Sequence, residues 1–235
     1  MSAFEHILAL IFPPRCPACG QVAPRVDVLC ATCEQKARRV PRPRCARCGQ
    51  EAARCACREG ELFEFDALVA PFYYDGAIGD SIRRMKFRQD PGIARFLGSE
   101  MARELKQERP DFRADLIVCV PLSPKGLRER GYNQCDLISS ALKAKTGWLF
   151  DSKALTKPVE NKTQHSLGRA LRFKNIRGVF TADAARVRGK RLLLIDDVST
   201  TGATLDECAR ILKKAGAESV VCLTAAVVEY SGVRT

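Results

Sequence analysis

Two hydrophobic patterns alternate along this chain, and they are clearest in its last third. Residues 192–195 (LLLI) are apolar without interruption, which is typical of a parallel strand buried on both faces. Apolar side chains then recur at the spacing of one helix face, at Leu205, Cys208, Ala209 and Leu212. The opposite face carries Asp206, Glu207, Arg210, Lys213 and Lys214, and Gly216 follows where a helix commonly ends. The pattern predicts a buried strand that leads into an amphipathic helix.

The same two patterns recur after about residue 60. Strand-like segments occupy residues 65–74, 115–120 and 219–228, whereas helical periodicity covers residues 77–87, 93–108 and 133–145. Strands that alternate with helices favour a largely parallel sheet flanked by helices. We therefore expect an α/β domain over residues 61–235, preceded by a small module over residues 1–60.

A hydroxyl-rich turn joins the strand at 192–195 to its helix. Asp196 and Asp197 end the strand, and the turn then reads Ser199, Thr200, Thr201, Gly202, Ala203 and Thr204. The carboxyl ends of parallel strands form the ligand edge of an open α/β sheet, and N–H groups at a helix start bind phosphate. Because carboxylates repel phosphate, we expect the two acids to accept hydrogen bonds from sugar hydroxyls. The combination predicts a site for a phosphorylated ribose.

Two other interpretations fit part of this turn. A Ser or Thr after a strand is also an ordinary helix N-cap. A strand that ends in acids also occurs in nucleotide hydrolases, but the chain contains no G-x-x-x-x-G-K-[ST] phosphate loop. The hydrolase interpretation therefore lacks its phosphate site.

Cysteine spacing indicates the chemistry of the first sixty residues. Eight of the 12 cysteines lie there in closely spaced pairs: Cys16, Cys19, Cys30, Cys33, Cys45, Cys48, Cys55 and Cys57. Such pairs are typical of tetrahedral zinc held by four thiolates, and sequential pairing gives two structural Zn²⁺ sites. Buried apolar cysteines are the alternative, but the segment has few large aliphatic residues to surround them. We expect this module to depend on zinc for folding.

Composition and charge narrow the class of protein. Apolar residues make up 46% of the 235 residues, which is enough for a folded core. No apolar stretch approaches the roughly 18 residues that span a membrane, so we expect no membrane span. Residues 4–12 are apolar but lack the basic leader of a signal peptide. Cysteines without a secretory signal favour a reducing compartment, hence a cytoplasmic location.

The net charge of +12 is unevenly distributed. Residues 120–178 carry 12 Lys and Arg against 4 Asp and Glu. Between the cysteine pairs, Arg38, Arg39, Arg42 and Arg44 form a stiff basic connector with two prolines. Such charge attracts a pyrophosphate or a nucleic-acid backbone, or it is simply a solvated surface, and charge alone does not choose among these.

The segment LLIDDVSTTGAT at residues 193–204 resembles the phosphoribosyl pyrophosphate (PRPP) signature of type I phosphoribosyltransferases. The resemblance implies that Asp196 and Asp197 hold the ribose 2′ and 3′ hydroxyls and that the turn binds the 5-phosphate. It also implies displacement at the ribose anomeric carbon, with Mg²⁺ neutralising the leaving pyrophosphate. The expected fold class is a type I phosphoribosyltransferase-like parallel sheet flanked by helices, preceded by a small zinc-ribbon module.

A second segment is expected at the same edge of the sheet, because residues 121–126 follow the predicted strand at 115–120. Its backbone amides and the cations in and beyond it offer a site for pyrophosphate. The residues of this predicted site are Leu122, Ser123, Pro124, Lys125, Gly126, Arg128 and Arg130.

Further motifs are similar to those of the ComF family. They are YYDGAIGDSIRRMKF at 73–87, VPLSPKGLRERGYNQ at 120–134, QHSL at 164–167 and RFKNIRGVF at 172–180, together with the double zinc ribbon. The resemblance covers essentially the whole chain. It implies a phosphoribosyltransferase-like protein that is linked, in competent bacteria, to uptake of single-stranded DNA. Single-stranded DNA and a competence helicase or another uptake factor are the implied partners.

Residues 156–171 are polar and basic, as in a mobile loop beside an active site. In type I enzymes such a loop closes over PRPP and brings a cation to the pyrophosphate. Lys162, His165 and Arg172 are the candidate catalytic residues, with Lys157 and Arg169 as further cations. For His165, an exposed loop histidine without a catalytic role is the alternative.

Two functions from different classes stay open. The first is PRPP-dependent transfer to an unknown nitrogen nucleophile, with the zinc module and residues 62–74 near the acceptor. The second is a non-catalytic accessory protein that handles single-stranded DNA in natural transformation. Aromatic residues make up only 7% of the chain, with Trp148 as the single tryptophan, which argues against a stacking platform for single strands.

Overall fold

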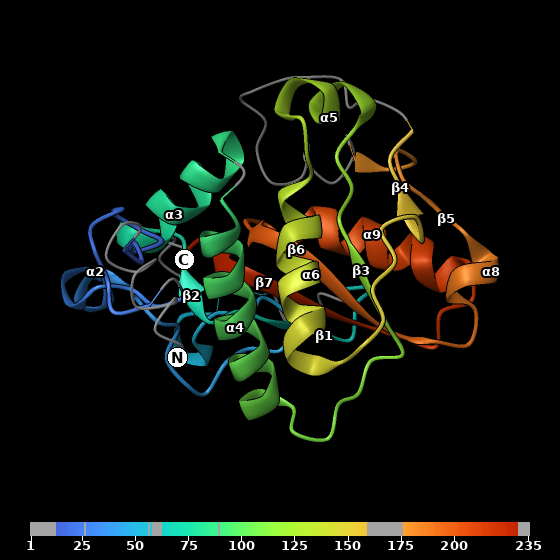
Figure 1. Cartoon of the computed structure of the whole chain (residues 1–235). Helices are drawn as coiled ribbons and strands as arrows, with labels where there is room; N and C mark the ends of the chain where they lie inside the picture. The colour runs from blue at the N-terminus through green and yellow to red at the C-terminus, as the bar shows by residue number, and fades with distance from the viewer. Residues whose placement is uncertain are drawn as a thin grey trace.

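The computed structural model describes residues 13–25, 27–55, 57, 63–88, 90–158 and 176–229. Its helices are α2 (Ala31–Lys36), α3 (Gly76–Phe87), α4 (Pro91–Glu108), α5 (Pro124–Arg130), α6 (Gln134–Thr146), α8 (Ala184–Val187) and α9 (Ala203–Lys214), with a 3₁₀ helix η1 (Ala52–Arg54). Its strands are β1 (Ala67–Val69), β2 (Phe72–Tyr73), β3 (Leu116–Cys119), β4 (Leu155–Thr156), β5 (Thr181–Ala182), β6 (Arg191–Ser199) and β7 (Ser219–Val227). Figure 1 shows these elements in place.

The centre of the molecule is a parallel sheet. Strands β1, β7, β6 and β3 lie side by side in that order, and β2 also pairs with β7. The predicted buried strand is confirmed, because Leu192, Leu193, Leu194 and Ile195 in β6 are fully buried. The segment predicted as one strand at 65–74 forms the two short strands β1 and β2, separated by Ala70 and Pro71. Strands β4 and β5 form a separate antiparallel pair.

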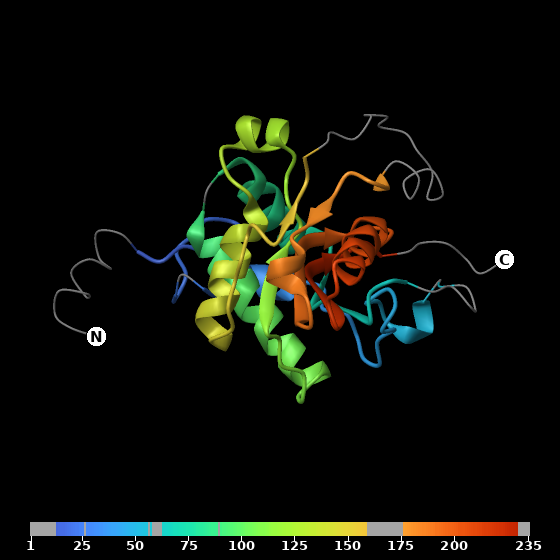
Figure 2. The same ribbon diagram turned by 90° about the vertical axis from the view of Figure 1, so that its right-hand side faces the viewer.

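Helices cover both faces of the sheet (Figure 2). One face packs against α3, α4 and α6 through residues such as Ile78, Leu97 and Ile138, and the other packs against α9 through Leu205 and Leu212. The core positions predicted for Cys119 and Cys222 are confirmed. Because apolar helix faces cover both sides of β6 and β7, these strands are apolar without alternation.

One predicted surface position on α9 was wrong. Glu207 is only 5% exposed. Its carboxylate pairs with Arg210 and accepts a hydrogen bond from the backbone N–H of Gly178 (2.9 Å). The chain that leads into β5 thus covers this part of the helix and satisfies the buried charge.

The cysteine-rich segment packs directly on the α/β core. Cys16 and Cys33 belong to the same buried cluster as the helices α3, α4 and α6. The connector, residues 37–44, runs along the edge of the sheet beside β2, where Val40 N–H donates to Pro71 O (3.0 Å) and Tyr73 N–H donates to Arg38 O (2.9 Å). The connector therefore covers an edge that would otherwise be open for pairing.

Candidate functional site

The acid pair, Asp196 and Asp197, lies near the carboxyl end of β6. Asp197 is 5% exposed, and its Oδ2 atom accepts a hydrogen bond from Gln134 Nε2 (3.0 Å) and lies 3.2 Å from Lys86 Nζ. Asp196 Oδ1 accepts hydrogen bonds from the Asp197 backbone N–H (2.8 Å) and the Cys135 thiol (3.6 Å). Helices α3 and α6 therefore bring a cation, an amide and a thiol to the two acids.

Burial and the charge of Asp197 raise the pKa of Asp196 to about 8. Two neighbouring carboxylates in a partly desolvated site repel each other, so the second is hard to ionise. Lys86 offsets part of this repulsion from the Asp197 side. Sugar hydroxyls or a divalent cation would stabilise the ionised pair further. Mg²⁺ prefers carboxylate and phosphate oxygens, so the acid pair fits that ion in the company of a phosphorylated sugar.

Lys86 and Gln134 are site residues that the sequence analysis did not single out. Each is near the end of a motif quoted for the ComF resemblance, at residues 73–87 and 120–134. Their positions in those motifs were the available signal. Neither is near the acid pair in sequence, and only the packing of α3 and α6 beside β6 brings them to Asp197.

The β6–α9 turn, residues 199–204, carries the chain from the strand into α9. Gly202 precedes the helix with a φ of 78°, a left-handed conformation that favours glycine. Thr201 Oγ1 accepts a hydrogen bond from Ala203 N (3.4 Å). A small pocket at the start of α9 is lined by residues of this turn and by Asp196. A helix N-terminus, several hydroxyls and an acid thus meet at one small pocket, and a helix N-terminus favours an anionic ligand.

The predicted pyrophosphate segment is part loop and part helix. Residues 121–123 form a loop, and α5 begins at Pro124. Ser123 caps this helix, because its Oγ atom accepts a hydrogen bond from Gly126 N (3.2 Å). The Gly126 amide therefore already has a partner within the chain.

One cation of this segment is connected to the acid pair. Arg130 NH1 donates to Gln134 Oε1 (2.5 Å), and the amide of Gln134 donates to Asp197. Lys125 instead lies 3.8 Å from Glu129 on the same helix. Arg130 is therefore connected to Asp197 through a single side chain, that of Gln134.

The eight predicted zinc ligands form two compact groups. The first cysteine group is Cys16, Cys19, Cys30 and Cys33, and the second is Cys45, Cys48, Cys55 and Cys57. Within each group all four sulfur atoms lie within 4.8 Å of one another. The sulfur atoms of Cys19 and Cys30 are 3.7 Å apart, as are those of Cys48 and Cys55. Zn–S bonds of about 2.3 Å in a tetrahedron separate sulfur atoms by about 3.8 Å, so both groups fit Zn²⁺.

The thiols of these groups differ in how easily they ionise. Burial opposes ionisation of Cys16 and Cys45, yet backbone N–H donors around each sulfur lower both pKa values to about 7. Burial and the neighbouring thiol of Cys55 raise the pKa of Cys57 to about 12. Four thiolates together need a compensating positive charge, which a bound Zn²⁺ supplies.

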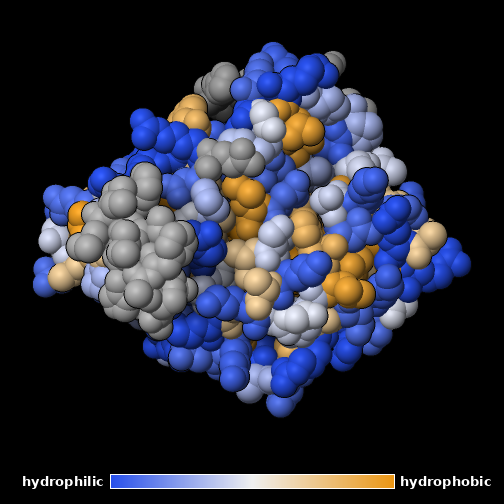
Figure 3. Space-filling model, viewed as in Figure 1, coloured by the Kyte–Doolittle hydropathy of each residue, from blue (hydrophilic) through white to orange (hydrophobic). Residues whose placement is uncertain are grey.

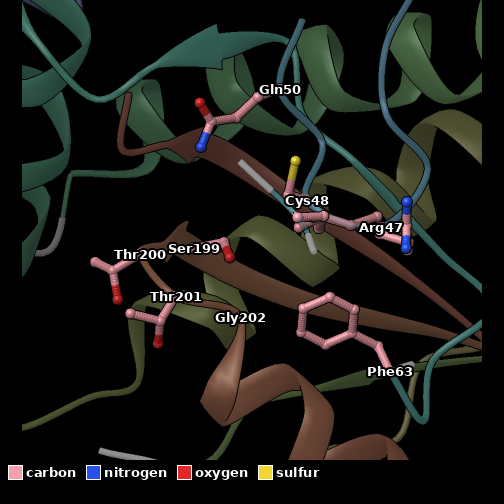
Figure 4. A pocket seen from close by; sticks show the side chains of 10 residues that line it. Arg47, Cys48, Gln50, Phe63, Ser199, Thr200, Thr201 and Gly202 are labelled. Carbon is pink, nitrogen blue, oxygen red and sulfur yellow. The ribbon is translucent and has the colours of Figure 1, made fainter. Parts of the chain in front are cut away.

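The second cysteine group borders the β6–α9 turn. A pocket between them is lined by Arg47, Cys48, Gln50 and Phe63 on one side and by residues 199–202 on the other (Figure 4). The contact is close, because a Cβ atom on Gly202 would lie 3.4 Å from the Phe63 ring. The expectation that the zinc module lies near the ligand edge therefore agrees with this geometry.

The connector is not a solvated linker, and that interpretation was wrong. Arg42 pairs with Glu108 (2.7 Å), Arg44 pairs with Glu108 (3.1 Å), and both arginines also contact Glu104. The side chains of Arg44 and Glu104 are only 7% and 5% exposed. The acidic face of α4 thus neutralises the connector and fixes it against the α/β core.

The candidate catalytic residues Lys162, His165 and Arg172 lie outside the described residues, as does Arg169. Lys157 is described, and its Nζ atom lies 5.7 Å from the centre of the Phe180 ring. The roles predicted for this loop stay predictions.

Comparison with known proteins agrees with this architecture of a phosphoribosyltransferase-like fold and a double zinc ribbon. A double zinc ribbon domain matches residues 7–62, and a phosphoribosyl transferase domain matches residues 126–231. The DNA utilization protein YhgH of Salmonella typhimurium is 30% identical over 208 residues, which cover 87% of this chain and 80% of that protein. The competence protein ComFC of Streptococcus pneumoniae is 30% identical over 164 residues, which cover 70% of this chain and 68% of that protein.

The chain therefore belongs to the ComF family, and the expected fold class is confirmed. Among solved structures, an adenine phosphoribosyltransferase covers 63% of this chain and 84% of its own length, at 15% identity and a TM-score of 0.40. Within the described residues, every helix is too short or too polar to cross a membrane.

Proposed function

We propose that this protein binds PRPP with Mg²⁺ at the β6–α9 turn and transfers its phosphoribosyl group to a nitrogen nucleophile. The observation that carries the proposal is the acid pair beside an open, hydroxyl-rich helix start, with Lys86 and Gln134 in contact with Asp197. Acids alone would repel a phosphorylated ligand, whereas acids next to a helix N-terminus favour one that carries both hydroxyls and phosphate.

In this proposal each group of residues binds a different part of PRPP. Asp196 and Asp197 accept hydrogen bonds from the ribose 2′ and 3′ hydroxyls, and the turn at 199–204 binds the 5-phosphate. Arg130, held by Gln134, contributes positive charge on the side where the pyrophosphate leaves. Bound Mg²⁺ supplies charge neutralisation for the pyrophosphate.

The reaction is a displacement at the ribose anomeric carbon. The bond from this carbon to the pyrophosphate oxygen breaks, pyrophosphate leaves with the electron pair, and a nitrogen lone pair forms the new bond. The nitrogen then releases a proton. Positive charge that develops on the sugar ring is stabilised by the nearby carboxylates of the acid pair.

The names of the relatives support a second candidate, an accessory role in the handling of single-stranded DNA. Both a DNA utilization protein and a competence protein align with most of this chain. In this role PRPP binding regulates or stabilises the protein without turnover. We also propose that the protein acts in the cytoplasm, because free thiolates persist for zinc binding in a reducing compartment.

Pyrophosphate release from PRPP separates these candidates. The zinc-loaded protein, Mg²⁺ and PRPP would be incubated with ammonia and with individual purine and pyrimidine bases, and bound PRPP would be measured in parallel by equilibrium dialysis. Release that depends on one acceptor and is lost in Asp196→Asn/Asp197→Asn supports the transferase. Binding without release under every acceptor supports the accessory role, and no binding overturns the transferase and the PRPP site. Asp206→Asn on α9 is the matched control.

A further inference from the structure

A basic groove lies at the opposite edge of the sheet from the acid pair. It has a volume of about 420 Å³ and is formed by the C-terminal ends of α4 and α6 and the chain that follows each helix. These helix ends lie below the sheet in Figure 1, whereas α5 lies above it. Because β3 begins just after this chain, the groove is at the amino ends of the parallel strands. It is therefore separate from the proposed PRPP site.

Two aromatic rings line the groove. Phe112 and Trp148 meet edge to face with ring centres 6.0 Å apart, and both are partly buried against the core. Leu149, next to Trp148, is 66% exposed. The rings are thus held in place by packing and still contribute to a surface that is open to a ligand.

Cations surround these rings. Arg103 and Lys106 lie three residues apart on one face of α4, and Arg109 follows directly at the C-cap of that helix. Arg113 lines the groove from the chain that follows α4, and Lys145 lines it from the last turn of α6. Figure 3 shows mostly hydrophilic residues along the lower part of the molecule, where these helix ends lie, with apolar patches above them.

Most of this charge is not neutralised. Arg103 pairs with Glu100 (2.5 Å), whereas Lys106 and Arg109 have no carboxylate partner among the described residues, and Lys145 forms no direct ion pair there although its charge acts on Asp27. The acids Glu104 and Glu108 on α4 pair with the connector instead. The acids of α4 therefore pair with the connector, whereas the cations at the C-terminal end of this helix face the groove.

We infer that this basic groove binds single-stranded nucleic acid, with the phosphates along the cations and a base stacked on the aromatic pair. A simple anion would use the cations but not the rings, and an apolar peptide would use the rings but not the cations. A duplex hides its base faces inside the stack. A single strand presents both groups at once, and base stacking on aromatic residues tolerates any sequence.

The inference deepens the second candidate function, the handling of single-stranded DNA, by assigning it a binding surface, and it does not depend on the PRPP site. The scarcity of aromatic residues argued against a stacking surface across the whole chain, but one local pair in a basic groove is enough for one or two bases. Since the two sites lie at opposite edges of the sheet, PRPP and a strand of nucleic acid can be bound together.

The single tryptophan of the chain provides a direct readout. Titration of the zinc-loaded protein with a 12-nucleotide oligo(dT) at low salt should quench the fluorescence of Trp148, because the base stacks on its ring. The logarithm of the affinity should fall with the logarithm of salt with a slope of about −2, as expected for three phosphates paired on a single strand. Inorganic polyphosphate should compete for the groove without quenching Trp148.

Substitutions in the basic groove test whether the single strand binds there. Lys106→Glu/Arg109→Glu should weaken oligo(dT) binding at least tenfold, measured by anisotropy of a labelled strand, whereas Lys214→Glu on α9 should not. Trp148→Ala should weaken binding about tenfold and Trp148→Phe much less. Equal affinity of the double variant and the wild type, or absence of quenching while the strand binds, would overturn the inference. The PRPP response of each variant should stay at the wild-type level, which separates failure of this inference from failure of the proposed function.

Discussion

The two cysteine groups have the same chemistry and different surroundings. In the first group, Cys16 and Cys33 are 1% and 7% exposed and belong to the main buried cluster, and Arg84 of α3 donates to the backbone carbonyl of Ala18 (2.8 Å). The second group instead faces the β6–α9 turn through Cys48 and Phe63. The first is therefore built into the folding core, whereas the second is built into the ligand edge.

Because the surroundings differ, we expect zinc binding to have a separate consequence at each site, for the core at the first and for the ligand edge at the second. Loss of zinc from the first site should disrupt the packing of Cys16 and Cys33 in the core beside α3. Loss of zinc from the second site should leave that packing intact but release the segment that lies against the β6–α9 turn. The connector links the two cysteine groups, and its ion pairs with α4 fix the position of the second group.

The largest expected effect comes from Cys33→Ser. Zinc binding in such modules is folding free energy, so a buried site that loses one thiolate should destabilise the core strongly. We expect the melting temperature to fall by about 10 °C or more. Differential scanning calorimetry and zinc content would be measured on the full chain.

Cys48→Ser is the matched variant in the second group. It should lose one zinc equivalent too, with a smaller fall in melting temperature and a clear loss of PRPP affinity. Equal melting temperatures for Cys33→Ser and Cys48→Ser would break the comparison.

Glu104→Gln tests the connector between the two groups. Glu104 and Arg44 are both buried, and an unpaired buried charge commonly costs about 3 kcal/mol or more. We expect a loss of about 3 kcal/mol in the free energy of unfolding, measured with urea. Glu100→Gln is the control, since its partners Arg39 and Arg103 are 36% and 49% exposed and such pairs contribute about 1 kcal/mol or less each. A loss no larger than that of the control contradicts the proposed anchoring.

Lys86→Met tests whether the ammonium group of Lys86 contributes to PRPP binding at the ligand edge. The ammonium group offsets the acid pair, so its removal should leave two carboxylates that repel an anionic ligand. We expect PRPP affinity to fall about tenfold, a change of about 1.4 kcal/mol, with little change in stability. Titration calorimetry would measure this, with Lys213→Met on α9 as the control. An unchanged affinity would remove Lys86 from the site.

The smallest effect concerns pH. The pKa of Asp196 is raised to about 8 in the folded protein, against about 3.9 in an unfolded chain. Between these values the folded state keeps a proton that the unfolded state has lost, so the contribution of Asp196 to stability falls as pH rises. Asp196→Asn lacks this dependence, and its free energy of unfolding relative to the wild type should rise by about 1 kcal/mol from pH 6 to pH 7. Parallel stability curves for the two proteins would contradict the raised pKa.

Periodicity and motif spacing predicted much of this structure. The run at 192–195 and the helix face at Leu205, Cys208, Ala209 and Leu212 were found as expected, because hydrophobic burial dictates both patterns locally. The two cysteine groups were also predictable, since zinc coordination imposes close spacing along the chain.

What the sequence did not predict depends on contacts between distant residues. Lys86 and Gln134 reach Asp197 only because α3 and α6 pack beside β6. The connector looked like a basic linker, because the acids that neutralise it, Glu104 and Glu108, lie some sixty residues away on α4. Charge in a sequence gives no information about its partner, whereas apolar periodicity does indicate a buried face.

The most direct test of the PRPP site is a thermal-shift titration of the zinc-loaded protein with Mg²⁺ and PRPP, beside Asp196→Asn/Asp197→Asn. Ligand at about 100 times its dissociation constant adds about 2.7 kcal/mol to the stability of the folded state. This should raise the melting temperature of the wild type by roughly 5–10 °C and leave that of the variant unchanged. A folded wild-type protein whose melting temperature does not respond to PRPP would contradict the assignment of the acid pair and the turn.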